Sequence, residues 1–211
     1  MVTAALTSRG LFLREFLRAP WQIGAVAPSS RRLAAAMVEP IPRAGAIVVV
    51  ELGPGPGAFT RHIEHRLDGR GRRLAVELNG RFATKLARQY PGLEVVCADA
   101  RHLPELLGER GVGDVDVIVS GLPWVGFDPD TQKSLLDAAC AVLGPNGTFV
   151  TFGYRMSSWT RPARRFRQLL RQEFEEVVIG RTIRLNFPSA FVFYARRPVR
   201  AGQKAASPPT S

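Results

Sequence analysis

Residues 48–57 read Val-Val-Val-Glu-Leu-Gly-Pro-Gly-Pro-Gly, a β-branched run that ends in an acid and three alternating glycines. An apolar run without polar alternation is typical of a parallel strand covered on both faces. Glycines after such a strand let the backbone turn sharply and let a ligand approach where a Cβ would clash. Residues 58–67 then predict a helix whose free N–H groups open beside the loop. Together these features predict the nucleotide-binding crevice of a doubly wound α/β sheet.

The spacing of the glycines indicates which nucleotide the crevice takes. A dinucleotide fingerprint reads G-x-G-x-x-G, whereas Gly53, Gly55 and Gly57 read G-x-G-x-G behind the acidic Glu51. This pattern resembles the first motif of the class I S-adenosylmethionine (SAM) methyltransferases. The resemblance implies SAM as the cofactor, with the three glycines beside its methionine part and Glu51 facing its amino group.

Strand and helix patterns alternate along the chain, which predicts a mostly parallel sheet. Strands are expected at residues 47–52, 73–78, 93–98, 115–120, 148–152, 176–182 and 190–195. Helices are expected at residues 30–38, 58–67, 80–89, 129–143 and 162–172. The last two strands follow one another without a helix, as in an antiparallel hairpin. Seven strands with this ending resemble the Rossmann-like sheet of class I methyltransferases, with helices on both faces.

The chain divides into three predicted regions. Residues 1–44 form an N-terminal helical extension, residues 45–197 the SAM-dependent methyltransferase domain, and residues 198–211 a disordered tail rich in Pro, Ala and Ser. Within the extension, Phe12, Leu13, Phe16 and Leu17 share one helical face, and arginines lie opposite. That pattern is typical of a helix lying in a membrane interface, although a helix docked on the domain fits it too.

Acids also end the second and third predicted strands. Glu77 lies about 20 residues beyond the last glycine, where a ribose-binding carboxylate belongs. Asp99 follows the third strand, where the family places an acceptor for the adenine amine. We therefore assign Glu77 and Asp99 to the SAM site, together with the residues that follow them, Leu78 and Ala100.

The fourth strand ends Ser-Gly-Leu-Pro-Trp at residues 120–124. Adenine and glutamine N-methyltransferases carry an Asn/Asp-Pro-Pro-aromatic run there, and its absence argues against a flat nucleobase as acceptor. The Ser-Gly-Leu-Pro run resembles bacterial phospholipid N-methyltransferases, as do Pro-Ser-Ser at 28–30, Gly-Tyr at 153–154 and Asn-Phe-Pro at 186–188. The resemblance covers residues 10–197.

The resemblance implies methyl transfer from SAM to the amine of phosphatidylethanolamine, up to three times, giving phosphatidylcholine. It places Ser120 as a further SAM contact, and Tyr154 and Ser120 as groups that orient the amine. Trp124, Arg155 and Arg184 are assigned to the acceptor. No metal is expected, because Cys97 and Cys140 lack ligand spacing and are predicted core thiols.

The charge of the chain predicts a polyanionic partner. Its 211 residues hold 29 Lys+Arg against 18 Asp+Glu, a net charge of +11. Either an anionic membrane or RNA satisfies this excess. An rRNA adenine N6-dimethyltransferase is the main alternative, because this chain resembles those enzymes in its glycine loop, the two following acids and its basic charge. A small-molecule methyltransferase is the next alternative, although it would leave the charge without a purpose. The amphipathic N-terminus favours anionic phospholipid over nucleic acid. No run approaches the roughly 20 apolar residues of a spanning helix, so a cytoplasmic protein peripheral on the membrane face is expected.

Overall fold

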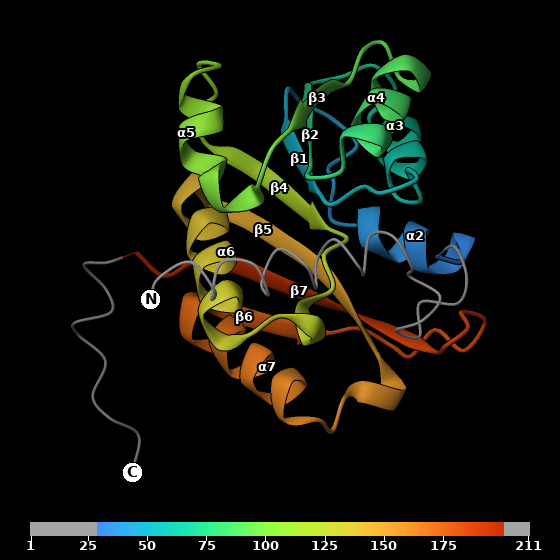
Figure 1. Cartoon of the computed structure of the whole chain (residues 1–211), viewed down its shortest axis with the longest axis vertical. Coiled ribbons are helices and arrows are strands. Elements are labelled where there is room, and N and C mark those ends of the chain that lie inside the picture. The colour runs from blue at the N-terminus through green and yellow to red at the C-terminus, as the bar shows by residue number, and fades with distance from the viewer. Residues whose placement is uncertain (1–28, 201–211) are drawn as a thin grey trace, which may run out of the picture.

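The computed structural model describes residues 29–200, which fold around one sheet (Figure 1). The seven strands lie in the order β3-β2-β1-β4-β5-β7-β6. The strands are β1 Val48–Leu52, β2 Arg72–Glu77, β3 Glu94–Cys97, β4 Val115–Ser120, β5 Leu143–Tyr154, β6 Phe174–Ile179 and β7 Ala190–Pro198. Strands β1 to β5 pair in parallel, and β7 runs antiparallel to both β5 and β6. The predicted Rossmann-like sheet with its antiparallel ending is confirmed.

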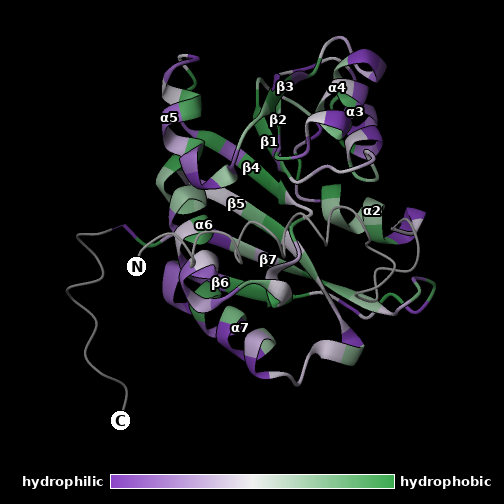
Figure 2. Ribbon diagram, viewed as in Figure 1, coloured by the Kyte–Doolittle hydropathy of each residue, from purple (hydrophilic) through white to green (hydrophobic). Residues whose placement is uncertain are grey.

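Helices cover both faces of this sheet. The helices are α2 Arg31–Val38, α3 Thr60–Leu67, α4 Gly80–Gln89, α5 Leu103–Gly108, α6 Pro129–Val142 and α7 Arg161–Glu173. Three 3-10 turns join them: η1 Ala100–His102, η2 Trp124–Gly126 and η3 Arg155–Ser157. Alternate residues of β1 show the two layers, because Val50 packs with α5, α6 and α7 and Val49 packs with α2 and α3. Figure 2 shows the hydrophobic strands enclosed by helices whose outer faces are hydrophilic.

Side-chain caps begin the helices where the sequence indicates them. The hydroxyl of Ser30 accepts from Leu33 N at 3.2 Å and caps the start of α2. Asn79, Asp128 and Thr160 cap α4, α6 and α7 in the same way. Each cap satisfies N–H groups that have no partner inside the helix. Helix α5 was not predicted; it has only six residues and follows directly on η1.

The order of the strands reverses between β1 and β4. Strand β1 pairs β2 on one side and β4 on the other, so the chain runs outward in both directions from this point. Ligands of open α/β sheets bind where the order reverses, beyond the carboxyl ends of the strands. The glycine loop after β1 and the Ser-Gly-Leu-Pro run after β4 therefore meet at the predicted crevice.

Candidate active site

The glycine loop has a backbone that favours glycine at each alternate position. Gly53, Gly55 and Gly57 have φ angles of 65°, 54° and 90°, in the left-handed region. A Cβ on Gly53 would lie 2.7 Å from the side chain of Leu122, so this position is also sterically closed. Nothing lies within 4 Å of a Cβ built on Gly55, which leaves that part of the loop open to a ligand.

Glu51 lies buried at the end of β1, under this loop. Its Oε2 accepts from the hydroxyl of Thr60 at 2.7 Å, and its Oε1 has no hydrogen-bond partner among the described residues. Burial raises the pKa of Glu51 to about 8; the Thr60 hydrogen bond opposes this shift, and the nearby charge of Glu77 adds to it. A buried oxygen without a hydrogen-bond partner destabilises the fold, and a ligand that donates a hydrogen bond to it removes that cost. Thr60 was not predicted as a site residue.

The raised pKa of Glu51 predicts a pH dependence of stability. In the unfolded chain this carboxyl loses its proton near pH 4.5, whereas the folded protein keeps it until about pH 8. Between those values the folded state binds more protons, so its stability falls as the pH rises. Because glutamine cannot ionise, we expect the Glu51→Gln protein to lose less stability than the wild type as the pH rises over this range. Melting temperatures of both proteins without SAM, from pH 5 to pH 9, should converge or cross as the pH rises; parallel curves would contradict the assignment.

Glu77 ties the end of β2 to the glycine loop. Its Oε2 accepts from Gly55 N at 2.8 Å and its Oε1 from Asn79 N at 2.7 Å. Burial raises the pKa of Glu77, and these backbone hydrogen bonds lower it in part. A carboxylate offers about four lone-pair sites, so acceptor capacity remains on Glu77, which is 1% exposed. Leu78, beside it, is 43% exposed, which suits an apolar contact for a ligand.

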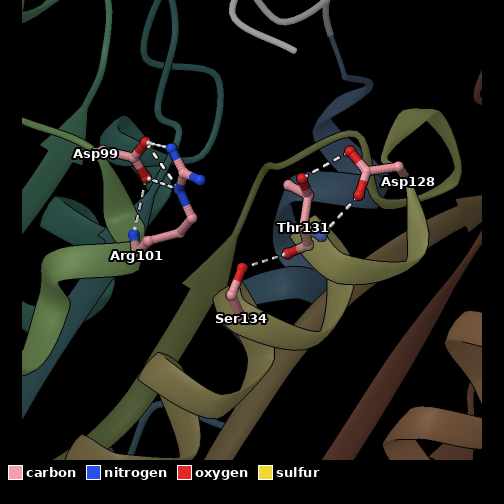
Figure 3. A network of polar contacts seen from close by, with 5 residues as sticks. All are labelled: Asp99, Arg101, Asp128, Thr131 and Ser134. Atoms are coloured by element: carbon pink, nitrogen blue, oxygen red, sulfur yellow. Dashed lines mark hydrogen bonds and ion pairs between the residues drawn. The ribbon is translucent and has the colours of Figure 1, made fainter. Parts of the chain in front are cut away.

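Asp99 makes contacts that its sequence position does not reveal. Its carboxylate accepts three hydrogen bonds from the Arg101 guanidinium, the shortest 2.6 Å, and one from Arg101 N at 2.9 Å (Figure 3). Burial alone raises the pKa of Asp99, but these hydrogen bonds outweigh it and hold the pKa below its usual value. The adjacent Ala100 is buried. Asp99 thus lies at the predicted strand end, and a ligand amine there shares the carboxylate with Arg101.

Ser120, which ends β4, and Trp124, which begins η2, are both buried in the core. The hydroxyl of Ser120, fully buried, accepts from Trp124 Nε1 at 3.0 Å, and its carbonyl accepts from the Thr151 hydroxyl at 3.1 Å. The indole of Trp124 stacks on Phe166 with ring centroids 4.5 Å apart and is 2% exposed. The structure corrects both assignments: Ser120 anchors Trp124, and Trp124 fills the layer between the sheet and α7.

Tyr154 and the predicted arginines lie at the far side of the crevice. Tyr154 ends β5, next to the end of β4, and burial raises its pKa. Arg155 follows it and is exposed, while Arg184 lies in the β6–β7 connection. Arg184 and Arg32 line a cavity of about 330 Å³ with Thr182, Ile183 and Leu185. Tyr154 thus lies at the end of β5, and Arg155 and Arg184 are both exposed.

The buried side-chain amide of Asn186 makes two contacts that were not predicted from the sequence. Asn186 accepts from Ser30 N at 2.9 Å and donates to the Pro188 carbonyl at 2.7 Å. Two of the segments that resembled phospholipid N-methyltransferases are therefore joined by a hydrogen bond. The prediction that Cys97 is a core thiol is wrong, because Cys97 is exposed.

The residues around the loop fit SAM on three counts. The open glycine loop admits a ligand at backbone distance, the unpartnered Glu51 Oε1 suits an ammonium group, and Glu77 keeps acceptor capacity for a ribose. SAM carries an activated methyl on a sulfonium, so the protein has to bind and orient it rather than activate it.

Comparisons with known proteins indicate the class of enzyme. Residues 49–147 match the methyltransferase domain family. The ornithine lipid N-methyltransferase of Singulisphaera acidiphila is 34% identical over 189 residues, which are 88% of this chain and 94% of that protein. A probable ribosomal RNA small subunit methyltransferase A of Methanopyrus kandleri is 39% identical over 100 residues, 46% of this chain and 33% of that protein.

A solved structure shows the same fold. The N-methyltransferase NodS of Bradyrhizobium japonicum, in complex with S-adenosyl-L-homocysteine, has a TM-score of 0.64 at 16% identity. The match covers 90% of this chain and 98% of NodS. With the glycine loop, the strand-end acids and a relative alike over nearly its whole length, this chain belongs to the class I SAM-dependent methyltransferases.

Proposed function

We propose that this enzyme methylates the primary amine of a zwitterionic membrane lipid. The observation that carries the proposal is the extent of the likeness to the ornithine lipid N-methyltransferase, which spans 88% of this chain. The likeness to the ribosomal RNA enzyme spans 46%. Ornithine lipid and phosphatidylethanolamine are the two candidate acceptors, because each has an amine and an anionic group. The sequence motifs favour phosphatidylethanolamine.

The region around Tyr154 is apolar and tightly packed. Aromatic side chains fill the region around Tyr154, and the cavity there encloses about 20 Å³, room for roughly one water molecule. Its lining includes Phe152, Phe191 and Phe193. An aliphatic amine is favoured over a nucleobase because residues 120–124 lack the Asn/Asp-Pro-Pro-aromatic run of adenine N-methyltransferases.

The chain's own residues suggest how such an acceptor is held. The exposed Arg32 and Arg184 provide guanidinium donors for a phosphate or carboxylate in the lipid headgroup. Tyr154, half-buried at the end of β5, offers a hydroxyl that accepts from the amine and orients its lone pair. A primary amine is protonated near neutral pH, so it must give its proton to solvent before the nitrogen attacks the methyl group. A neutral hydroxyl in apolar surroundings favours the uncharged amine.

Tyr154→Phe is expected to lower turnover about tenfold, because one orienting hydrogen bond contributes about 1.4 kcal/mol at the transition state. SAM affinity should be unchanged, since the ring remains and the loop is untouched. Steady-state kinetics with lipid in excess measure this. Tyr194→Phe is the control, because that hydroxyl donates to the Ala36 carbonyl at 3.0 Å and supports packing only. Full turnover in Tyr154→Phe would remove the tyrosine from the mechanism.

Labelled SAM identifies the acceptor directly. The full-length protein is incubated with phosphatidylethanolamine vesicles, with ornithine lipid vesicles, and with ribosomal RNA, and each fraction is counted. Label in either lipid supports the proposal and names the acceptor. Label in RNA alone would establish the alternative.

The membrane partner is proposed as well. The predicted amphipathic helix with Phe12 and Phe16 lies outside the described residues. Within residues 29–200, no helix is both long and apolar enough to cross a bilayer. We propose peripheral attachment to anionic phospholipid, and the +11 charge supports it.

A further inference from the structure

Two loops beside the acceptor pocket expose large apolar side chains. In the connection from β5 to α7, Met156 is 64% exposed and Trp159 72%. In the connection from β6 to β7, Leu185 is 66% exposed and Phe187 77%. We call these four residues the apolar tips. Side chains of this size are usually covered, and several exposed together mark an interaction surface.

The two loops are neighbours in the fold. Tyr154 pairs with Ala190, and Arg155 N donates to the Ser189 carbonyl at 2.9 Å, so one loop begins where the other ends. Figure 1 draws the turn after β5 and the β6–β7 loop on the same side of the molecule. The apolar tips therefore belong to one surface, at the carboxyl end of β5.

The β6–β7 loop is held by hydrogen bonds at its base. Asn186, between Leu185 and Phe187, is buried and bonds to Ser30 N and to the Pro188 carbonyl. Ile183 forms a β-bridge with Ala190. The loop thus presents its apolar side chains outward from an ordered base, which lowers the entropy lost when they bind.

The surface around the tips is positively charged. Residues 138–172 and 177–211 contain no Asp or Glu. Exposed arginines in and beside the two loops are Arg155, Arg161, Arg164, Arg181 and Arg184. Arg184 also lines the cavity of about 330 Å³ with Arg32, next to Leu185. Apolar side chains ringed by arginines match the boundary of a bilayer, where acyl chains meet anionic headgroups.

We propose that the apolar tips insert into the headgroup region of an anionic lipid bilayer and hold the acceptor entrance against it. The proposal names the partner of the same site and rests on the proposed lipid acceptor. A second copy of this chain fits poorly, since it carries the same positive surface. Residues 1–28 also fit poorly, with three arginines and one glutamate. Base stacking on RNA would leave Met156 and Leu185 without a role.

Tryptophan fluorescence tests insertion without any need for turnover. Full-length protein is mixed with phosphatidylcholine vesicles containing phosphatidylglycerol, with and without bromine on the acyl chains near the headgroup. Trp159 is the exposed tryptophan in the described part of the chain, and Trp124 is buried. Bromolipid should quench the wild type clearly more than Trp159→Phe. Equal quenching of both proteins would overturn the proposal.

Vesicle binding tests the same surface with matched variants. Trp159→Ser combined with Phe187→Ser should weaken binding to anionic vesicles about tenfold or more, because two aromatic side chains that would be buried in the bilayer are lost. Arg155→Gln combined with Arg181→Gln should weaken it too, and more so at low salt. Arg81→Gln combined with Arg88→Gln, two exposed arginines of α4 at the opposite end of the sheet, is the charge-matched control. Equal loss in the control would show a nonspecific charge effect and overturn the proposal.

A second substrate form separates this surface from the proposed function. The Trp159→Ser, Phe187→Ser protein should lose activity on vesicles and keep it on a short-chain, water-soluble form of the same lipid. Loss on both forms, in a folded protein, would mean that these residues serve the acceptor site and not the bilayer. If the wild type methylates no lipid in either form, the proposed function fails, while quenching and vesicle binding still decide whether the surface exists.

Discussion

Glu77→Ala is expected to weaken SAM binding about a hundredfold. Two backbone N–H groups, of Gly55 and Asn79, donate to this carboxylate at 2.8 and 2.7 Å. The same carboxylate is our predicted acceptor for the ribose hydroxyls. Its loss removes the ligand contact and also releases the glycine loop. Hydrogen bonds to a charged group contribute roughly 1.5–3 kcal/mol, and about 2.7 kcal/mol corresponds to a hundredfold change in affinity.

Isothermal calorimetry with SAM measures this loss, and circular dichroism checks that the variant is folded. Glu94→Ala is the matched control, because Glu94 lies on the neighbouring strand β3 and pairs with Arg72 and Arg110 in half-exposed ion pairs. Exposed pairs contribute little, so the control should bind SAM like the wild type. Unchanged affinity in folded Glu77→Ala would exclude this acid from the cofactor site.

Gly121→Ala is expected to lower both stability and SAM affinity. A Cβ at this position would lie 2.7 Å from the Gly53 carbonyl oxygen, and Gly121 N already donates to the Leu52 carbonyl at 2.8 Å. Both neighbours are backbone, so no side-chain rotation relieves the clash, and the ends of β1 and β4 must separate. Overpacking of this kind costs about 1–3 kcal/mol. For a chain of this size, that predicts a melting temperature lower by roughly 2–10 °C.

SAM affinity should fall roughly tenfold in the same variant, because the displaced Gly53 begins the cofactor loop. Calorimetry and thermal melts give both values. Gly108→Ala, in α5, is the control: nothing lies within 4 Å of its built Cβ, so neither value should fall. A Gly121→Ala protein with wild-type melting and binding would show that the two strand ends tolerate separation.

Local patterns carried most of the secondary structure. The strand at Val115–Ser120 and the helix at Gly80–Gln89 were predicted with the observed bounds, and most other bounds differ by one or two residues. Buried parallel strands and capped helices have patterns that can be recognised within short windows of sequence. Strand β5 begins at Leu143, five residues earlier than expected, because Gly144, Pro145 and Gly147 interrupt the apolar pattern. Helix α5 is too short to show a helical period.

The strand-end acids were predictable for a related reason. A residue at the carboxyl end of a parallel strand must face the same edge as its neighbours, so Glu51, Glu77 and Asp99 were placed by position alone. What each carboxylate bonds to was not predictable. The contacts of Glu77 with Gly55 and of Glu51 with Thr60 depend on how the loop folds back over the strands.

The sequence by itself determined the order of strands and helices, the glycine loop and the edge at which the cofactor acids meet. Those features follow from local periodicity, backbone sterics and the geometry of parallel strands. Only the tertiary structure decided that Trp124 is a core residue stacked on Phe166, and that Ser120 anchors it. Only the tertiary structure placed the loops of Trp159 and Phe187 side by side. Burial and proximity depend on which elements pack together, and residues far apart in the chain carry no local sign of their contact.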